Sequence, residues 1–476
     1  MKFLTKNAIV IVFISLLFIS TFCVEPILPE GEDAEFTHFE FVNMVGDTKI
    51  DRNKRTIVSQ ISDIADVENL IPTFVLTHGA TAYIEDVVQK SGVSENDFSQ
   101  IVNYKIVSGN RKNITYWEVA IVTVPDLKQQ QDDYEFTRGA ILPEGIYNFK
   151  GDVRVADSVC VIIEAGAKII LAENAKITIG KDAWFIVNGT YGKPIEFTSD
   201  TENWCGFVFN NVKEVEFSFC NFANAGQPSS NFMQINGSNI GILNCNFNNI
   251  TYTGFVLDAN STFRVFDNNN LNNVASEDGH PIVFNSINSA SNLGENNTIT
   301  NTDTTKGILI KDGTIINSIT LIGQNCPYII ETDVTCNIND VTLFIRNGVK
   351  IIMNNNNKII VGNNDKKMLF KAEGTASSRV VFQGKDNSAG IWEGISIGSS
   401  ILAGSNLTNC DILYAGNGDN SGAIRCHGTN INILTIQNCS IKHANSHAIY
   451  FTKGSFAKLI DNDFDDIAYD TTHIEP

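Results

Sequence analysis

The sequence is short of basic residues. Its 476 residues include 34 Lys and Arg against 53 Asp and Glu, a formal net charge of −19. This acidity argues against nucleic acid or an anionic lipid surface as a partner. An acidic glycan would also be repelled unless the chain carried a local basic patch. With 43% hydrophobic and only 18% charged residues, the composition excludes general disorder.

Several motifs of metal sites are also missing. The sequence has no Asp-x-Asp-x-Asp-Gly calcium loop and no Cys-x-x-Cys pair. No segment after residue 22 is apolar over the length that a transmembrane helix needs. We therefore expect no cofactor, no bound metal and no nucleic-acid partner.

The N-terminus has the pattern of a targeting segment. Lys2 and Lys6 precede a short apolar run that ends before Cys23. We predict a signal peptide over 1–22, and Cys23 resembles the acylated cysteine of bacterial lipoproteins. The acidic stretch 23–34 reads as a tether and resembles the surface-export signals of lipoproteins from Bacteroides-like bacteria. These features predict an outer-membrane or cell-surface lipoprotein, with ordinary secretion as the alternative.

Small residues recur about every 25 positions, and each is followed two residues later by a large apolar residue. The set comprises Cys220, Cys245, Asn269, Asn297, Cys410, Cys439 and Asn462. This period predicts a parallel β-helix of about 13 rungs, each of about 25 residues. Because Asn fills the same column as Cys, the thiols are interpreted as packed small residues. Neighbouring column thiols, Cys220 with Cys245 and Cys410 with Cys439, are either bridged or stacked as free thiols, and Cys326 with Cys336 is the remaining candidate disulfide.

A second set of positions has the same period. The strands at 207–210, 233–236, 255–258, 282–285 and 308–311 have apolar first and third residues and a middle residue that varies. One face of each strand therefore belongs to a core. Rungs stack roughly 4.8 Å apart. The polar residues that close the strands should then form a ladder of Asn210, Asn236, Asp258 and Asn285.

A longer duplication overlies the rungs. Residues 161–209 align with 343–397, so that Trp204 matches Trp392 and Gly206 matches Gly394. We predict two β-helix segments, 138–342 and 343–476. The two tryptophans are expected to pack over the turn that enters the first full rung, in preference to serving as exposed platforms for sugars.

The region 35–126 lacks the rung pattern and reads as short strands separated by turn signals, which favours a β-sandwich. It resembles the small immunoglobulin-like domains near the N-termini of Bacteroidetes surface lipoproteins, which imply a spacer. The matching landmarks are Pro72–Phe74, His78–Ala80, Ser91-Gly92, Asn96–Phe98, Val102–Tyr104 and Tyr116–Val119. A linker is expected over 127–137.

The remainder resembles right-handed parallel β-helix repeat proteins of the same bacteria. The resemblance rests on the phrases AGAKIIL, NGVKIIM, GKPIEFTS, WCGFVF, WEGISI, NCNF and NCSI. The fold class expected for the whole chain is therefore all-β, an immunoglobulin-like sandwich followed by a right-handed parallel β-helix. One such fold serves many functions.

A catalytic site is hard to find in the sequence. Polygalacturonase-type hydrolysis needs clustered carboxylates, and after Asn301-Thr302-Asp303 the other elements of that signature do not follow. The one concentration of His and Arg lies near the C-terminus, where aligning Ile424 with Ile449 stacks Arg425 on Tyr450. The candidate ligand-binding residues are Arg425, His427, Lys442, His443, His447 and Tyr450.

The favoured function is binding of a polysaccharide or another surface ligand along the outer face of the solenoid. A stack of strands presents a rigid repeating array to a repeating polymer. A β-helix polysaccharide lyase or glycoside hydrolase is the first alternative, and an adhesin or structural stalk is the second. Acids and a base converging on adjacent rungs would favour the enzyme, and an exposed aromatic row would favour glycan binding.

Overall fold

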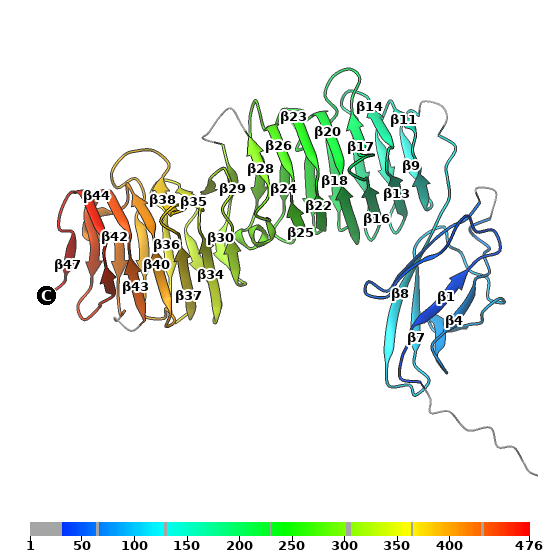
Figure 1. Cartoon of the computed structure of the whole chain (residues 1–476), viewed down its shortest axis with the longest axis horizontal. Helices are drawn as coiled ribbons and strands as arrows, with labels where there is room; N and C mark the ends of the chain where they lie inside the picture. The colour runs from blue at the N-terminus through cyan, green and yellow to red at the C-terminus, as the bar shows by residue number, and fades with distance from the viewer. Residues whose placement is uncertain are drawn as a thin grey trace, which may run out of the picture.

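The computed structural model describes residues 31–476 apart from 63–65, 128–130, 229, 301–305, 363–364 and 430–432. It is all-β, with a β-solenoid of about 13 turns following an N-terminal sheet domain. The solenoid forms one long body, and the N-terminal domain lies beside its first rungs (Figure 1). The predicted fold class is confirmed.

The N-terminal domain consists of two sheets around an aromatic core. The smaller sheet pairs β1 (Phe36–Glu40) with β4 (Thr73–Leu76), and the larger has the order β2-β3-β8-β7-β5-β6. Its strands are β2 (Lys49–Asp51), β3 (Thr56–Gln60), β5 (Thr81–Ile84), β6 (Val87–Gln89), β7 (Val102–Val107) and β8 (Ile114–Val122). Phe36 lies at the centre of the core, with the rings of Phe39, Phe74, Tyr104 and Trp117 edge-on around it.

The first solenoid segment has three parallel sheets. The first contains β10 (Ala140–Leu142), β13 (Cys160–Glu164), β16 (Trp184–Asn188), β19 (Glu214–Ser218), β22 (Asn239–Leu243) and β25 (Thr262–Asp267). The second contains β11 (Ile146–Phe149), β14 (Lys168–Leu171), β17 (Ile195–Thr198), β20 (Cys220–Ala225), β23 (Asn246–Ile250), β26 (Asn270–Val274) and β28 (Thr298–Thr300). The third contains β9 (Tyr134–Phe136), β12 (Val153–Val155), β15 (Lys176–Ile179), β18 (Gly206–Asn210), β21 (Met233–Asn236), β24 (Phe255–Leu257), β27 (Ile282–Phe284) and β29 (Ile308–Ile310).

The second segment extends this third sheet, which we call the long sheet, through every remaining rung. It adds β32 (Tyr328–Ile330), β35 (Lys350–Met353), β38 (Val380–Gly384), β41 (Cys410–Leu413), β44 (Ser440–Phe451) and β46 (Asp463–Ile467). A new sheet holds β31 (Ile319–Leu321), β34 (Val341–Arg346), β37 (Met368–Glu373), β40 (Ser405–Thr408), β43 (Leu434–Gln437) and β45 (Lys458–Ile460). The other holds β30 (Gly313–Ile315), β33 (Val334–Cys336), β36 (Lys358–Val361), β39 (Gly394–Ile397), β42 (Asn417–Cys426), the end of β44 and β47 (Thr472–Ile474).

Strands that are equivalent by sequence lie in different sheets in the two segments, displaced by one sheet around the solenoid. By sequence β35 is the counterpart of β14, yet β35 continues the long sheet, to which β14 does not belong. The 3-10 helix η1 (Ile287–Asn292) and the short strands β30 and β31 fill the junction. The predicted Cys/Asn column is therefore not continuous. Its first four members begin or precede strands of the second sheet, and its last three lie on the long sheet.

Within each part the column is a buried ladder. The side-chain oxygen of Asn269 accepts the backbone N–H of Cys245 at 3.0 Å, and its amide donates to the carbonyl of Ile242. Asn297 repeats this arrangement with Asn269 one rung further on. The nine cysteines of the described residues are all free thiols, including Cys326 and Cys336, so the disulfide expected there is absent. In the turn ladder, the Asn236 amide donates to Asn210 at 3.0 Å as predicted.

Trp204 and Trp392 occupy equivalent buried positions. Each is 0% exposed, and each indole N–H donates to a backbone carbonyl, that of Ala223 or Leu413. The glycines two residues later have φ of +124° and +99°, a region that favours glycine. The prediction that the tryptophans pack over an entry turn is confirmed, and neither ring can stack on a sugar.

The N-terminal domain is packed firmly against the solenoid. Ala120 and Val122 share a small apolar core with Ile141, Cys160 and Trp184 of the first rungs. Two ion pairs flank it, Lys54 with Glu214 at 2.8 Å and Lys213 with Glu118 at 3.1 Å. β9, inside the range expected to be a linker, pairs with β12 as a solenoid strand.

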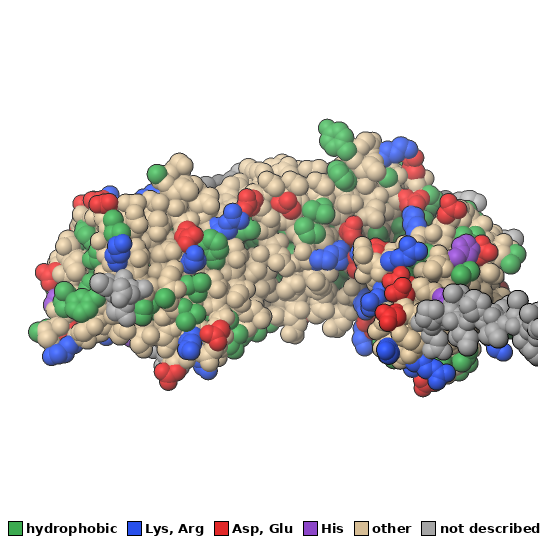
Figure 2. All heavy atoms as spheres, turned by 60° about the horizontal axis from the view of Figure 1, so that its bottom comes forward, with side chains coloured by type: hydrophobic (Ala, Val, Ile, Leu, Met, Phe, Trp, Pro, Cys, Tyr) green, Lys and Arg blue, Asp and Glu red, His purple; other side chains and the backbone are tan. Residues whose placement is uncertain are grey.

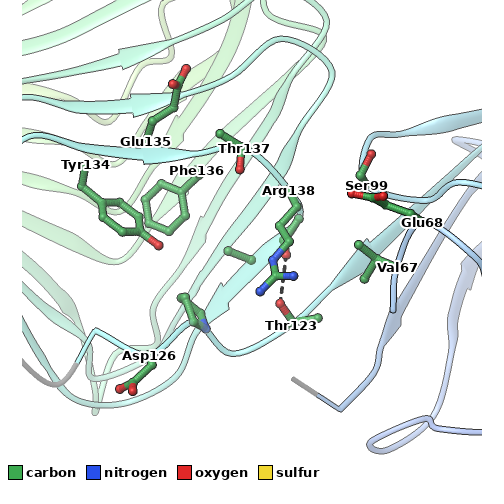
Figure 3. A pocket seen from close by; sticks show the side chains of 13 residues that line it. Val67, Glu68, Ser99, Thr123, Asp126, Tyr134, Glu135, Phe136, Thr137 and Arg138 are labelled. Atoms are coloured by element: carbon green, nitrogen blue, oxygen red, sulfur yellow. Dashed lines mark hydrogen bonds between the residues drawn. The ribbon is translucent and has the colours of Figure 1, made fainter. Parts of the chain in front are cut away.

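A cleft of about 540 Å³ remains at this junction (Figure 3). Thr123 closes one side, where its backbone N–H donates to the Gly139 carbonyl at 3.2 Å. Val67, Glu68 and Ser99 of the N-terminal domain face Arg138 of the solenoid across the cleft. The junction is therefore a packed interface with a small cleft beside it.

Candidate functional site

The structure places Arg425 and Tyr450 on adjacent rungs, as the sequence predicted. Ile424 pairs with Ile449 and Arg425 with Tyr450 between β42 and β44. The Arg425 guanidinium lies 6.0 Å from the centre of the Tyr450 ring, and His473 stacks at 5.0 Å against the same ring. Tyr450 is only 2% exposed. Its ring is covered by protein and is not a platform for a sugar.

Lys442 and His443 lie on a different face from Arg425. They belong to the first half of β44, which pairs with β41 and β46 in the long sheet. Lys442 faces Asp463 at 3.7 Å, and His443 bonds Asp466 at 2.7 Å while stacking on Tyr414. The six residues singled out from the sequence are therefore divided between two sheets and do not form one site.

His447 belongs to a ring cluster at the last rung. Its ring stacks on His473 at 4.4 Å, and its Nδ1 accepts the backbone N–H of Asp470 at 3.1 Å. Among the described residues these two histidines and Asp470 are the group whose ligand atoms lie within 4.8 Å of one another. The two ring planes lie 27° apart, and the Nδ1 lone pair of His447 is already occupied by the N–H of Asp470. This geometry suits packing of the final rung better than coordination of one ion.

His427 lines a shallow cavity of about 400 Å³ over β36, β39 and β42. Its Nε2 lies 3.3 Å from the Ser396 hydroxyl, and burial, with the nearby Arg425 cation, lowers the pKa of the imidazole. The adjacent carboxylate of Glu393 is held by Lys358 at 2.6 Å. A general base acting on a serine needs a group that orients it. Within the described residues His427 has no carboxylate in that position.

A larger groove lies on the long sheet at the junction of the two segments, and sequence reasoning missed it. It encloses about 750 Å³. Its floor is formed by outward side chains of four successive strands, Leu309 of β29, Ile329 of β32, Ile352 of β35 and Gln383 of β38. At about 4.8 Å per rung the floor extends roughly 14 Å along the solenoid axis.

Both rims of the groove are polar. The rim before the strands carries Asp278, His280, Lys306 and Lys350, and the rim after them carries Glu331, Asn354 and Lys385. Lys306 is held by the carbonyls of Ala275 and Glu277 at 2.9 and 3.1 Å. Burial lowers the pKa of His280, whose Nδ1 lies 3.0 Å from the Gly307 carbonyl. The neutral ring donates that hydrogen bond and fixes the start of β27 against β29.

The apolar floor continues beyond the groove along the long sheet. Val256, Val283 and Leu309 form a buried cluster on the outer face of the sheet, with Ile329 packed against it. The sequence carried the signal, because the outward residue is apolar in five consecutive rungs, at Val256, Val283, Leu309, Ile329 and Ile352. An outward strand position is usually polar when it faces water. Figure 2 shows charged side chains crowded on the N-terminal domain, while mainly uncharged surface covers the middle of the solenoid.

Comparison with known proteins finds a family match for the N-terminal domain. Residues 36–121 match the family model described as "SGBP, N-terminal", where SGBP denotes surface glycan-binding protein. That match covers the N-terminal domain and leaves the solenoid unassigned. The described part of the chain contains no helix with the length and hydropathy that a membrane span requires.

The other comparisons add little. One solved structure, described as a candidate glycoside hydrolase from Bacteroides thetaiotaomicron, is 20% identical with a TM-score of 0.17. The similarity covers 19% of this chain and 25% of that structure, too small a share to support an argument about function. No curated protein matches the sequence. Cys23 and Asn301–Asp303 lie outside the described residues.

Proposed function

We propose that this protein binds glycans at the cell surface and that the groove over β29, β32, β35 and β38 is the binding site. The observation that carries the proposal is the match of residues 36–121 to the surface glycan-binding family model. The groove supports it with an apolar floor of regular spacing, suited to the carbon-bound faces of sugar rings. Its amide, ammonium and carboxylate rims suit their hydroxyls.

The proposal includes the anchor and the orientation. Acylation of Cys23 would hold the chain at the outer membrane through the tether 23–34, with the N-terminal domain next to the membrane. The packed junction would then make that domain a rigid membrane-proximal support for the solenoid, because apolar contacts and two ion pairs hold it against the first rungs. The solenoid would project the groove at a defined angle.

A binding assay with a matched pair of variants tests the proposal. The chain from residue 24 would be run through gels containing single polysaccharides, neutral and acidic, and the polymers would then be chromatographed for products. We expect at least one polymer to retard the protein and to remain intact. Ile352→Asn should weaken the retardation, whereas Ile170→Asn, at the same repeat position on β14 outside the groove, should not.

Two results would contradict the proposal. Release of new oligosaccharides would show an enzyme and would direct attention to His427 and Ser396. Failure of every polysaccharide to retard the protein would favour a protein-binding adhesin or a stalk.

A further inference from the structure

The groove carries a cluster of lysines that the rest of the fold does not neutralise. Lys306, Lys350 and Lys385 line it, against the two acids Asp278 and Glu331. In a chain with 53 acidic and 34 basic residues, a surface with more lysines than acids departs from the average. Among the described residues, neither Lys350 nor Lys385 has a carboxylate within ion-pair distance.

The internal duplication allows Lys350 to be compared with the equivalent lysine of the first segment. In the first segment Lys168 pairs across β14 and β17 with Glu196, and its ammonium lies 3.1 Å from that carboxylate. In the second segment Lys350 occupies the equivalent position, and its partner across β35 and β38 is Val381. The lysine is present in both segments, but its acidic partner is present only in the first. The change leaves a cation free at the edge of the groove.

The remaining rim extends the same charge. Lys385 is exposed and directly follows Gly384, the last residue of β38. The ammonium of Lys306 is fixed by two backbone carbonyls, which accept two of its three N–H donors and bring no negative charge to it. His280 adds no positive charge near neutral pH, because burial lowers its pKa. The ligand face of the groove therefore combines apolar rungs with a locally basic rim.

We infer that the groove selects anionic glycans, whose carboxylate or sulfate groups lie against Lys350 and Lys385 while the sugar rings cover Leu309, Ile329 and Ile352. This inference rests on the proposed function. The net negative charge of the chain repels such polymers in general, so attraction confined to one groove would also fix the binding position.

The test compares charged polymers with their neutral counterparts. Affinity of the chain from residue 24 would be measured by calorimetry for polygalacturonate against its methyl ester, and for dextran sulfate against dextran. The first pair tests recognition of carboxylates and the second of sulfates. We expect at least one anionic polymer to bind about tenfold or more tightly than its neutral form, with the difference shrinking as salt is raised.

Two double variants locate the effect. Lys350→Gln/Lys385→Gln should reduce binding of the anionic polymer by about tenfold and leave the neutral form unchanged. Lys168→Gln/Lys176→Gln removes two lysines that have acidic partners, and it should change neither affinity.

The outcomes distinguish failure of the anionic selectivity from failure of the proposed glycan-binding function. Equal binding of charged and neutral forms, lost in Ile352→Asn, would overturn the anionic selectivity and keep the glycan groove. Charge-dependent binding that survives Lys350→Gln/Lys385→Gln would place the anion elsewhere and overturn the inference. Binding of no polymer would overturn both.

Discussion

Replacing Asn269 tests the physical basis of the solenoid. The side chain is 1% exposed, accepts the backbone N–H of Cys245 at 3.0 Å and donates to the carbonyl of Ile242 at 3.0 Å. In Asn269→Ala both backbone groups stay buried without a partner. Each unsatisfied group costs about 1–3 kcal/mol, so the two together should cost about 2–6 kcal/mol.

Asn246 provides a matched control. It is exposed and its amide bonds Asn221 at 2.9 Å on the outside of the same sheet. Water can replace that bond, so Asn246→Ala should cost less than about 0.5 kcal/mol. Asn269→Cys should fall between the two, because Cys220 and Cys245 fill the same column and bond nearby carbonyls through their thiols.

Hydrogen exchange followed by mass spectrometry is the suitable assay, because a solenoid opens locally and a single unfolding energy for the chain is ill-defined. The peptides across β22, β23 and β26 should lose protection by about 30- to 25,000-fold in Asn269→Ala. Equal protection in Asn269→Ala and Asn246→Ala would refute the reasoning that the column is a buried hydrogen-bond ladder.

Three further predictions concern other parts of the molecule. Trp392→Ala should cost about 3–5 kcal/mol of local stability around β39 and β42, and Trp392→Phe about 1 kcal/mol through loss of the bond to Leu413, both read by hydrogen exchange. Val122→Asp should open the junction between the domains and raise the radius of gyration in X-ray scattering, whereas Val124→Asp, at a 38% exposed position, should not; an unchanged radius in Val122→Asp would contradict the packed junction. Because burial lowers the pKa of His280 below its usual 6.5, the unfolded chain takes up the proton first as pH falls, so stability is complete above about 6.5 and declines below it. His280→Gln should flatten that decline in the hydrogen-exchange protection of β27 and β29 between pH 7.5 and 5, after correction for the intrinsic exchange rate. An unaltered slope would show that His280 does not cause it.

The architecture could be predicted well from the sequence, because the same pattern of small, apolar and polar residues recurs in every rung of the β-helix. The Cys/Asn column, the alternation within strands and the pairing of Trp204 with Trp392 each reflect a local rule of burial. The pairing of Arg425 with Tyr450 was also predictable, since it follows from aligning two neighbouring rungs.

The groove was harder to predict because it depends on how the two segments join. At the junction, Leu309 and Ile329, which precede the second duplicated block at 343–397, come into line with Ile352 and Gln383 inside it. The sequence alignment alone puts β35 with β14, which belongs to another sheet. Lys442 and the neighbouring histidines are concentrated in the sequence but not in space. The first half of β44, with Lys442 and His443, lies in the long sheet, whereas its second half, with His447, pairs with β42.

The most direct test of the central claim is a hydrogen-exchange footprint of the chain with a saturating polysaccharide that the binding assay identifies. The account predicts added protection in peptides that cover residues 306–311, 328–331, 350–354 and 381–385, and no change in those that cover 421–429 and 447–451. Protection on the latter face, or on none of the solenoid, would contradict the assignment of the groove as the glycan-binding site.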